Sequence, residues 1–271
     1  MAAPESTRVA AADTTCLEER QPETLPPQRR VTKWVLAILY EAALIAALLM
    51  TYRWIRYLLD GQTAKADANA QRVWHAERQL HLPSEITMQH WALAWEPVAR
   101  LCNLYYFSAH FPATAVMLAW LFIFKRSAYP RVRLELMLLT ACGLLLQALL
   151  PLTPPRLAGL GLVDTMRTVG PSTYPDGDQG IANQHAAMPS LHIGWAILVA
   201  IVVTRVATTK WRWLVWIHPT LTVFVVVVTA NHYWLDGIVA AALLWGVIGC
   251  VSSRVWKPTE ELQPSMATSE S

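Results

Sequence analysis

The sequence predicts an all-α fold that crosses a membrane several times, and two observations support this fold class. Of the 271 residues, 54% are hydrophobic and only 15% are charged, which lies outside the usual balance of soluble globular domains. The chain also contains several apolar runs close to the length of about 20 helical residues that a bilayer crossing needs. We expect six membrane spans, at residues 33–52, 104–124, 134–152, 188–206, 213–230 and 233–251.

These spans predict one membrane domain over residues 31–256. We expect the first span to be retained, because a long polar stretch precedes it and no small-residue cleavage site follows it. The tails at 1–30 and 257–271 are polar and contain several prolines, so we expect both to be disordered and cytoplasmic.

Basic residues predict the orientation of the spans. Short basic segments lie before span 1, between spans 2 and 3, between spans 4 and 5, and after span 6; they contain Arg29, Arg30, Lys33, Lys125, Arg126, Arg131, Arg133, Arg205, Lys210, Arg212, Arg254 and Lys257. The positive-inside rule places these segments and both termini in the cytoplasm. Segments 53–103, 153–187 and 231–232 are then extracytoplasmic.

The segment 53–103 carries an apolar stripe whose members recur at steps of three and four residues, namely Met88, Trp91, Trp95, Val98 and Cys102. Such a stripe predicts an outer helix that lies on the membrane surface and shapes lipid access. A lid that packs on the bundle without specificity is the alternative.

The composition also argues against several ligands. The net charge of +3 is modest, and the basic residues follow the topology, so we expect no nucleic-acid partner. The four cysteines, Cys16, Cys102, Cys142 and Cys250, show no paired spacing, which predicts neither disulfides nor a structural metal. We expect no cofactor of another kind.

Three polar motifs fall at the outer ends of spans: TPPRL at 153–157, PSLH at 189–192 and NHYWLD at 231–236. Two spans begin at the second and third motifs, so their N-terminal N–H groups point toward one pocket and favour an anion. Arg156 in the first motif carries a planar guanidinium that matches phosphate oxygens. We therefore expect a phosphate group as the ligand.

His232 and Asp236 are four residues apart and share one helix face. The carboxylate can hold one ring nitrogen protonated, while the other nitrogen acts as a nucleophile or a base. The pocket is expected to include Pro189 in the first helical turn, Ser190 as a hydroxyl donor, Asn231 and His185.

The order of these motifs, PPR, then PSLH, then HYxxD, resembles the type 2 phosphatidic acid phosphatase (PAP2) superfamily. The likeness covers spans 3 to 6 most closely and extends in general layout to the six-helix chain. The resemblance implies that His232 attacks phosphorus to form a phosphohistidine, that Asp236 orients it, and that His192 protonates the leaving alkoxide. It also implies that Arg156 and Ser190 hold the phosphoryl oxygens of a lipid phosphate or phospholipid.

The chain departs from the family pattern at three positions. Leu191 replaces a glycine of the second motif, and Val225 and Val226 stand where a serine and an arginine are expected. This combination is similar to the inositolphosphotransferase branch, which includes inositol phosphorylceramide synthases. The resemblance therefore implies transfer of a phosphoryl head group to an alcohol such as inositol as readily as hydrolysis.

Three alternatives stay open on these residues. The first is a plain phosphatase for a polyprenyl or glycerolipid phosphate. The second is a membrane cytochrome in which His192 and His232 are axial haem ligands. The third is a non-catalytic relative that binds lipid.

Overall fold

The computed structural model describes residues 62–170 and 186–255, together with separate residues between 35 and 54. The chain divides into two compact units, residues 1–49 and 50–271. The described residues between 35 and 54 are helical.

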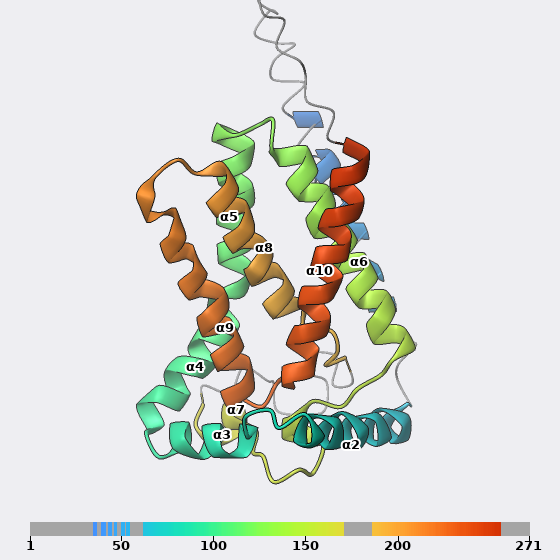
Figure 1. Ribbon diagram of the computed structural model, residues 1–271, viewed down its shortest axis with the longest axis vertical. Helices are drawn as coiled ribbons and strands as arrows, with labels where there is room; N and C mark the ends of the chain where they lie inside the picture. Colours follow the sequence, from blue (N-terminus) through green and yellow to red (C-terminus); the bar gives the residue numbers. More distant parts are fainter. Residues whose placement is uncertain are drawn as a thin grey trace, which may run out of the picture. The chain divides into compact units, whose positions relative to one another are not determined.

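Helices joined by short turns and loops make up the described part of the second unit. They are α2 (Thr63–Gln79), α3 (Glu85–Leu93), α4 (Glu96–Ser108), α5 (His110–Phe124), α6 (Tyr129–Leu149), η1 (Pro155–Leu157), α7 (Thr165–Thr168), α8 (Leu191–Val206), η2 (Lys210–Trp216), α9 (Ile217–Val228) and α10 (Trp234–Val255). The described residues contain no β-strand, and Leu152 and Ala186 form an isolated bridge. This confirms the all-α fold class. Figure 1 shows α5, α6, α8, α9 and α10 running lengthwise, while α2 and α3 lie across one end.

Three helices in the described part are long and apolar enough to cross a membrane. They are α6, the continuous stretch η2 and α9 (Lys210–Val228), and α10 over Trp234–Ser252. Helices α4 and α5 make a fourth candidate if the pair counts as one span. Helix α8 is apolar but has only 16 residues. The count of six spans stays a prediction.

The span predicted at 104–124 is not one straight helix, because α4 and α5 meet at an angle of 42°. Pro112 lies in the first turn of α5 and has no N–H to donate to the carbonyl of Ser108, four residues earlier. The Ser108 hydroxyl in turn bonds back to the Leu104 carbonyl at 2.6 Å. The bend therefore falls where the helical hydrogen-bond pattern is interrupted.

The apolar stripe predicted for one outer helix is divided between two helices. Helix α3 ends at Leu93, and Trp95 precedes the first residue of α4. Trp91 and Trp95 are exposed by 55% and 64%, whereas Cys102 is buried. The expectation of a single helix with one apolar face is wrong, because the chain turns between Leu93 and Glu96.

Helix α8 lies at the centre of the bundle and contacts α5, α6, α9 and α10. Its buried side chains form one hydrophobic core with those of its neighbours, including Leu121, Leu139, Leu198, Ile201 and Leu244. A Cβ atom added at Gly237 would lie 2.7 Å from Cδ1 of Ile193. Glycine at that position lets the first turn of α10 approach the first turn of α8.

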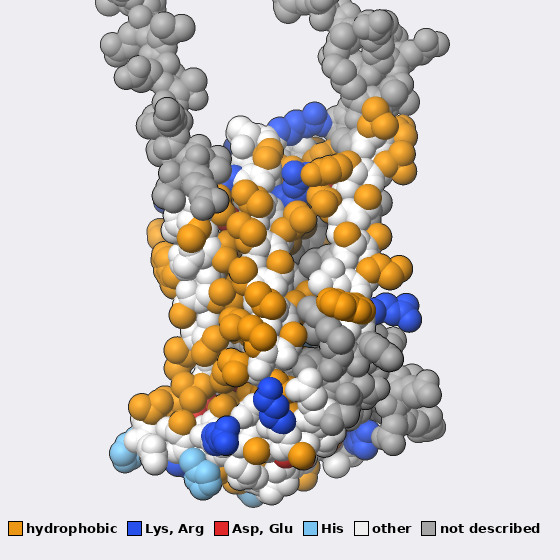
Figure 2. Space-filling view, turned by 90° about the vertical axis from the view of Figure 1, so that its right-hand side faces the viewer, with side chains coloured by type: hydrophobic (Ala, Val, Ile, Leu, Met, Phe, Trp, Pro, Cys, Tyr) orange, Lys and Arg blue, Asp and Glu red, His pale blue; other side chains and the backbone are white. Residues whose placement is uncertain are grey.

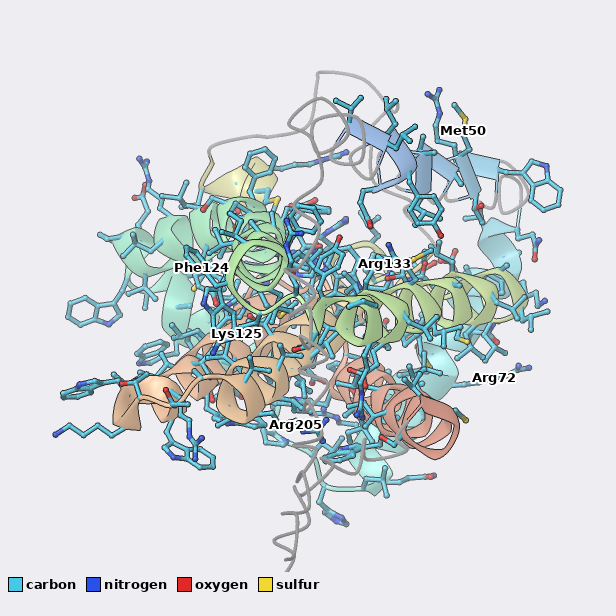
Figure 3. The ribbon with its side chains drawn as sticks, turned by 90° about the horizontal axis from the view of Figure 1, so that it is seen from above. Met50, Arg72, Phe124, Lys125, Arg133 and Arg205 are labelled. Carbon is cyan, nitrogen blue, oxygen red and sulfur yellow. The ribbon has the colours of Figure 1, made fainter. Side chains whose placement is uncertain are left out.

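The surface of the bundle is apolar along its sides. Large hydrophobic side chains exposed there include Phe111, Val116, Ile123, Leu145, Leu149, Ile238 and Trp245, and Figure 2 shows hydrophobic side chains over most of the height of one side. Lys125, Arg133 and Arg205 lie near the ends of α5, α6 and α8 that face the viewer in Figure 3. Apolar sides with basic ends are typical of a membrane protein.

Candidate active site

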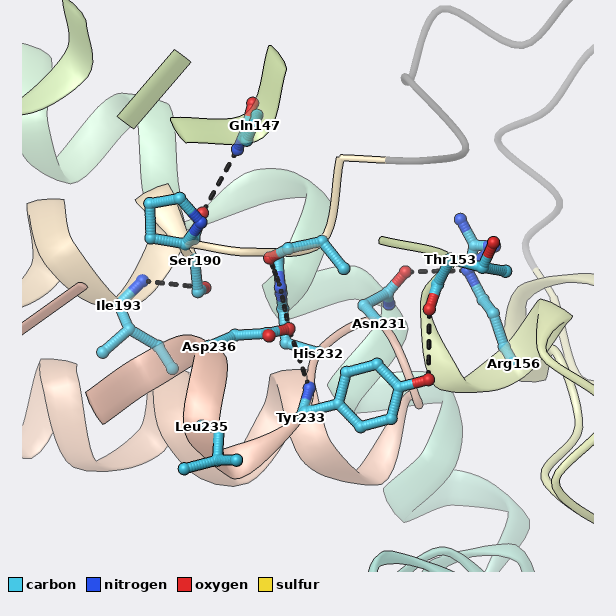
Figure 4. A network of polar contacts seen from close by, with 12 residues as sticks. Gln147, Thr153, Arg156, Ser190, Ile193, Asn231, His232, Tyr233, Leu235 and Asp236 are labelled. Atoms are coloured by element: carbon cyan, nitrogen blue, oxygen red, sulfur yellow. Dashed lines mark hydrogen bonds and ion pairs between the residues drawn. The ribbon is translucent and has the colours of Figure 1, made fainter. Parts of the chain in front are cut away.

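The three sequence motifs meet where α8 and α10 begin. The backbone N–H of Arg156 donates to the carbonyl of Ala230 at 3.0 Å, and that of Ser190 donates to the carbonyl of Asp236 at 3.1 Å. These bonds join η1 to the segment before α10, and the start of α8 to the first turn of α10. Figure 4 shows Arg156, Ser190 and His232, one residue from each motif, in the same region. Backbone geometry thus holds all three motifs together.

His232 lies between α9 and α10, and its ring is held through Nδ1. This atom is 2.8 Å from the carbonyl oxygen of Ala187 and 3.2 Å from Oδ2 of Asp236. A carbonyl oxygen can only accept a hydrogen bond, so Nδ1 carries the proton. The lone pair of the neutral ring is therefore on Nε2.

Asp236 is fully buried, and one of its oxygens makes two contacts. Oδ2 faces Nδ1 of His232 and also accepts from the backbone N–H of Tyr233 at 2.9 Å. Oδ1 has no hydrogen-bond partner within the described part of the chain. Through Oδ2 the carboxylate both stabilises the start of α10 and orients the histidine.

His192 is half-buried in the first turn of α8, and its ring centroid lies 5.7 Å from that of His232. Tyr106 stacks on His192 with centroids 4.5 Å apart, and the His110 ring lies 4.4 Å away. His110 in turn stacks on Trp195. Rings from α4 and α5 thus fix the orientation of His192 beside His232.

Burial and the nearby positive charge of Arg156 together lower the pKa of His232 to about 4, against the opposing effect of the Ala187 carbonyl. His232 is only 6% exposed. The ring is therefore neutral at pH 7, which is the form that a nucleophile requires.

Arg156 is positioned by two side chains. Its Nε donates to Oδ1 of Asn231 at 2.9 Å, and Nη1 is 3.8 Å from Oδ2 of Asp164. Asn231 is itself oriented by the Thr229 hydroxyl, which accepts from Nδ2 at 2.8 Å. The amide oxygen of Asn231 is thus engaged by Arg156, and Asn231 helps to position the guanidinium.

Ser190 precedes the first residue of α8, and its hydroxyl accepts from the backbone N–H of Ile193 at 3.4 Å. The hydroxyl hydrogen remains available for donation, although the residue is fully buried. Pro189 precedes Ser190 and lies outside the helix, so the expectation of a proline in the first helical turn is wrong. Instead Pro189 presents its carbonyl to Nε2 of Gln147 at 3.2 Å. His185 lies outside the described residues.

Two groups at the site were not expected from the sequence. The Ala187 carbonyl, which holds His232, belongs to the backbone, and its segment is tied to the stretch that follows α6, because Ala187 N donates to Leu152 O at 3.1 Å. Glu77 of α2 is fully buried and accepts from the backbone N–H of Leu235 at 2.8 Å. No motif or spacing marks Glu77 in the sequence.

The arrangement combines an oriented neutral imidazole, a second imidazole within reach of the same ligand, and a buried guanidinium. Within the described residues, no three His, Cys, Asp or Glu side chains are grouped as metal ligands. The chemistry that these groups can perform is nucleophilic attack on a phosphorus centre, with proton transfer to the leaving oxygen.

Comparison with known proteins identifies the family. Residues 71–250 match a family model described as the PAP2 superfamily. No curated protein and no solved structure matches the chain significantly. The matched segment contains all three motifs and most of the chain. The chain belongs to the PAP2 superfamily.

Proposed function

We propose that this chain transfers a phosphorylated head group from a membrane lipid to an acceptor alcohol, such as inositol, through a phosphohistidine on His232. Membership of the superfamily supports the coarser statement that the protein is a phosphatase-type enzyme acting on lipid phosphoesters. The single observation that carries the proposed phosphohistidine is the fixed tautomer of His232, which leaves Nε2 as the nucleophilic atom.

In the first step, Nε2 of His232 attacks phosphorus, and the bond from phosphorus to the lipid oxygen breaks. His192 donates a proton to that oxygen, so the lipid leaves as an alcohol. Asp236 stabilises the positive charge that develops on the His232 ring. The product of this step is a phosphohistidine with its proton still on Nδ1.

In the second step, an acceptor hydroxyl attacks phosphorus, and the bond from phosphorus to Nε2 breaks. His192 takes the proton of the acceptor, which restores both histidines. Water in place of the alcohol gives hydrolysis, which is the phosphatase alternative. Splitting one displacement into two lowers each barrier.

Arg156, the Ser190 hydroxyl and the N-terminal N–H groups of α8 are the groups assigned to the phosphoryl oxygens. Val225 and Val226 are 4% and 1% exposed, so the positions at which the resemblance expects serine and arginine are part of the apolar core. A site with fewer cationic contacts suits a phosphodiester, which carries less charge than a terminal phosphate. This supports transfer of a head group.

We further propose six spans with both termini in the cytoplasm and the active site outside. Lys125, Arg133 and Arg205 support this, because Arg205 lies near the end of α8 that is remote from Ser190. In a chain whose own cysteines are replaced, an impermeant thiol reagent applied to intact cells should label Arg72→Cys and not Lys125→Cys. Labelling of Lys125→Cys and not of Arg72→Cys would mean that the chain has the opposite orientation.

The function is tested with purified full-length protein, a lipid phosphodiester radiolabelled at phosphorus, and inositol present or absent. Inositol-dependent appearance of label in a new phosphodiester supports transfer, whereas labelled phosphate or free head-group phosphate supports hydrolysis. An alkaline quench preserves phosphohistidine, and we expect label on the wild-type chain but not on His232→Asn. A Soret band in the purified protein would support the haem alternative, and lipid binding without turnover the non-catalytic one.

A further inference from the structure

The carboxylate of Asp164 faces two guanidinium groups. Its Oδ2 is 3.8 Å from Nη1 of Arg156 and 3.9 Å from Nε of Arg167. The side chains of Asp164 and Arg156 are 10% and 7% exposed, whereas that of Arg167 is 59% exposed. A largely buried negative charge therefore lies beside the residue to which the proposed function assigns the substrate phosphate.

Buried amide side chains hold the backbone on both sides of Asp164. Gln89 accepts from the N–H of Val163 at 2.9 Å and donates to its carbonyl, also at 2.9 Å. Asn103 donates to the carbonyl of Thr165 at 3.0 Å and accepts from its hydroxyl at 2.7 Å. These four bonds, from α3 and α4, keep the carboxylate at a fixed distance from Arg156.

The local backbone does not require the charge of Asp164. Its Oδ1 accepts from the N–H groups of Met166 and Arg167, at 3.1 Å and 3.4 Å. Asparagine or serine caps a helix start about as well as aspartate. The cap therefore accounts for Oδ1 of Asp164 but not for the charge on Oδ2, which faces the two guanidinium groups.

We propose that Asp164 selects the charge of the substrate phosphate, favouring a phosphodiester with one negative charge over a phosphomonoester with two. This inference rests on the proposed function, in which Arg156 binds the phosphoryl oxygens. Arg156, Arg167 and Asp164 together carry one net positive charge, which a monoanion neutralises. A dianion carries a second negative charge, which the Asp164 carboxylate repels and which these three residues do not neutralise. At this range in a partly solvated site, the repulsion corresponds to about a ten-fold difference in affinity.

Asp164→Asn tests the inference, because asparagine keeps the cap and the side-chain size but removes the charge. A lipid phosphomonoester and its methyl diester are compared at about pH 8, where the monoester carries two charges. We expect the ratio of kcat/KM for monoester to diester to rise about ten-fold in Asp164→Asn. Asp164→Ser, which also caps, should raise it similarly. Glu96→Gln removes an exposed carboxylate on α4 that pairs with Arg100, and it should leave the ratio unchanged.

Binding of the same two lipids to His232→Asn, with and without Asp164→Asn, gives a second readout that needs no turnover. An unchanged ratio in both measurements, with the variants folded, overturns the role of Asp164. A wild-type chain that turns over neither lipid contradicts the proposed function instead, while the binding ratio still decides the question of charge selection.

Discussion

Replacing Asp236 with asparagine separates two ways in which the site can hold the His232 ring. Oδ2 of Asp236 makes both contacts of the carboxylate, to Nδ1 of His232 and to the N–H of Tyr233, while Oδ1 has no partner among the described residues. Asparagine can place its single oxygen at the Oδ2 position. Its NH₂ group then lies at the Oδ1 position, where no hydrogen-bond donor among the described residues opposes it. Both hydrogen bonds can therefore persist in Asp236→Asn without the negative charge.

The Ala187 carbonyl determines the size of the effect. It lies 2.8 Å from Nδ1, closer than the carboxylate at 3.2 Å, and it holds the same tautomer without Asp236. The variant then loses only the difference between a charged and a neutral acceptor, about 1–2 kcal/mol. This corresponds to a fall of roughly 5- to 30-fold in kcat/KM. Inversion of the tautomer, by comparison, costs about 10⁴-fold in a Ser-His-Asp triad.

The assay is the initial rate with a lipid phosphodiester, with thermal unfolding midpoints measured on the same preparations. Asp236→Ala is the companion variant: it removes the acceptor of the Tyr233 N–H as well, so we expect a larger loss of both rate and stability. A loss near 10⁴-fold in folded Asp236→Asn would refute the reasoning, because it would mean that the Ala187 carbonyl does not hold the tautomer.

Three further predictions concern His232, Arg156 and Glu77. Because burial lowers the pKa of His232 to about 4, the fall of kcat/KM for a phosphodiester toward acidic pH should be centred near pH 4. Arg156→Gln removes a neighbouring cation and should move this acidic fall to higher pH. An acidic fall centred near pH 6.5 in the wild-type chain contradicts this prediction. Arg156→Lys should lower kcat/KM by about 10²-fold or more, because lysine lacks the planar guanidinium and its bond to Asn231. Asn231→Ala should lower kcat/KM by a smaller factor, and an equal loss of kcat/KM in the two variants would argue against an indirect role for Asn231. Burial beside Glu85 raises the pKa of Glu77 to about 9, so its side chain is neutral at pH 7 and Glu77→Gln should unfold close to the wild-type temperature. Glu77→Ala leaves the Leu235 N–H without its acceptor and should lose about 1–3 kcal/mol of stability. Equal unfolding midpoints for Glu77→Ala and the wild-type chain would count against a stabilising role of this hydrogen bond.

The sequence predicts the meeting of the motifs because each stands at a helix boundary and the boundaries follow from hydropathy. PSLH and HYxxD lead into apolar runs, and the helices α8 and α10 each begin at the third residue of the motif, at Leu191 and Trp234. The approach of the two helix starts depends on Gly237, whose neighbour Ile193 would meet a Cβ atom. The spacing of side chains along a sequence carries no information about such a contact between helices.

Two helix breaks were missed although each has a local signal. Pro97 lies in the first turn of α4, and proline is common at that position, yet the periodicity of the apolar stripe runs through it unchanged. Pro112 similarly falls within an apolar run that is long enough to be one span. Hydropathy averages over about 20 residues, so it detects the membrane but not a bend within it.

The oxygen that fixes the proton of His232 belongs to the peptide group of Ala187, and every amino acid supplies the same atom. Exchanging the side chain at position 187 therefore leaves this acceptor in place, and alanine scanning passes over the position because it is already alanine. A chemically synthesised ester linkage between residues 187 and 188, whose carbonyl is a weaker acceptor, is the kind of alteration that would reveal what the main chain contributes to the reactivity of the imidazole.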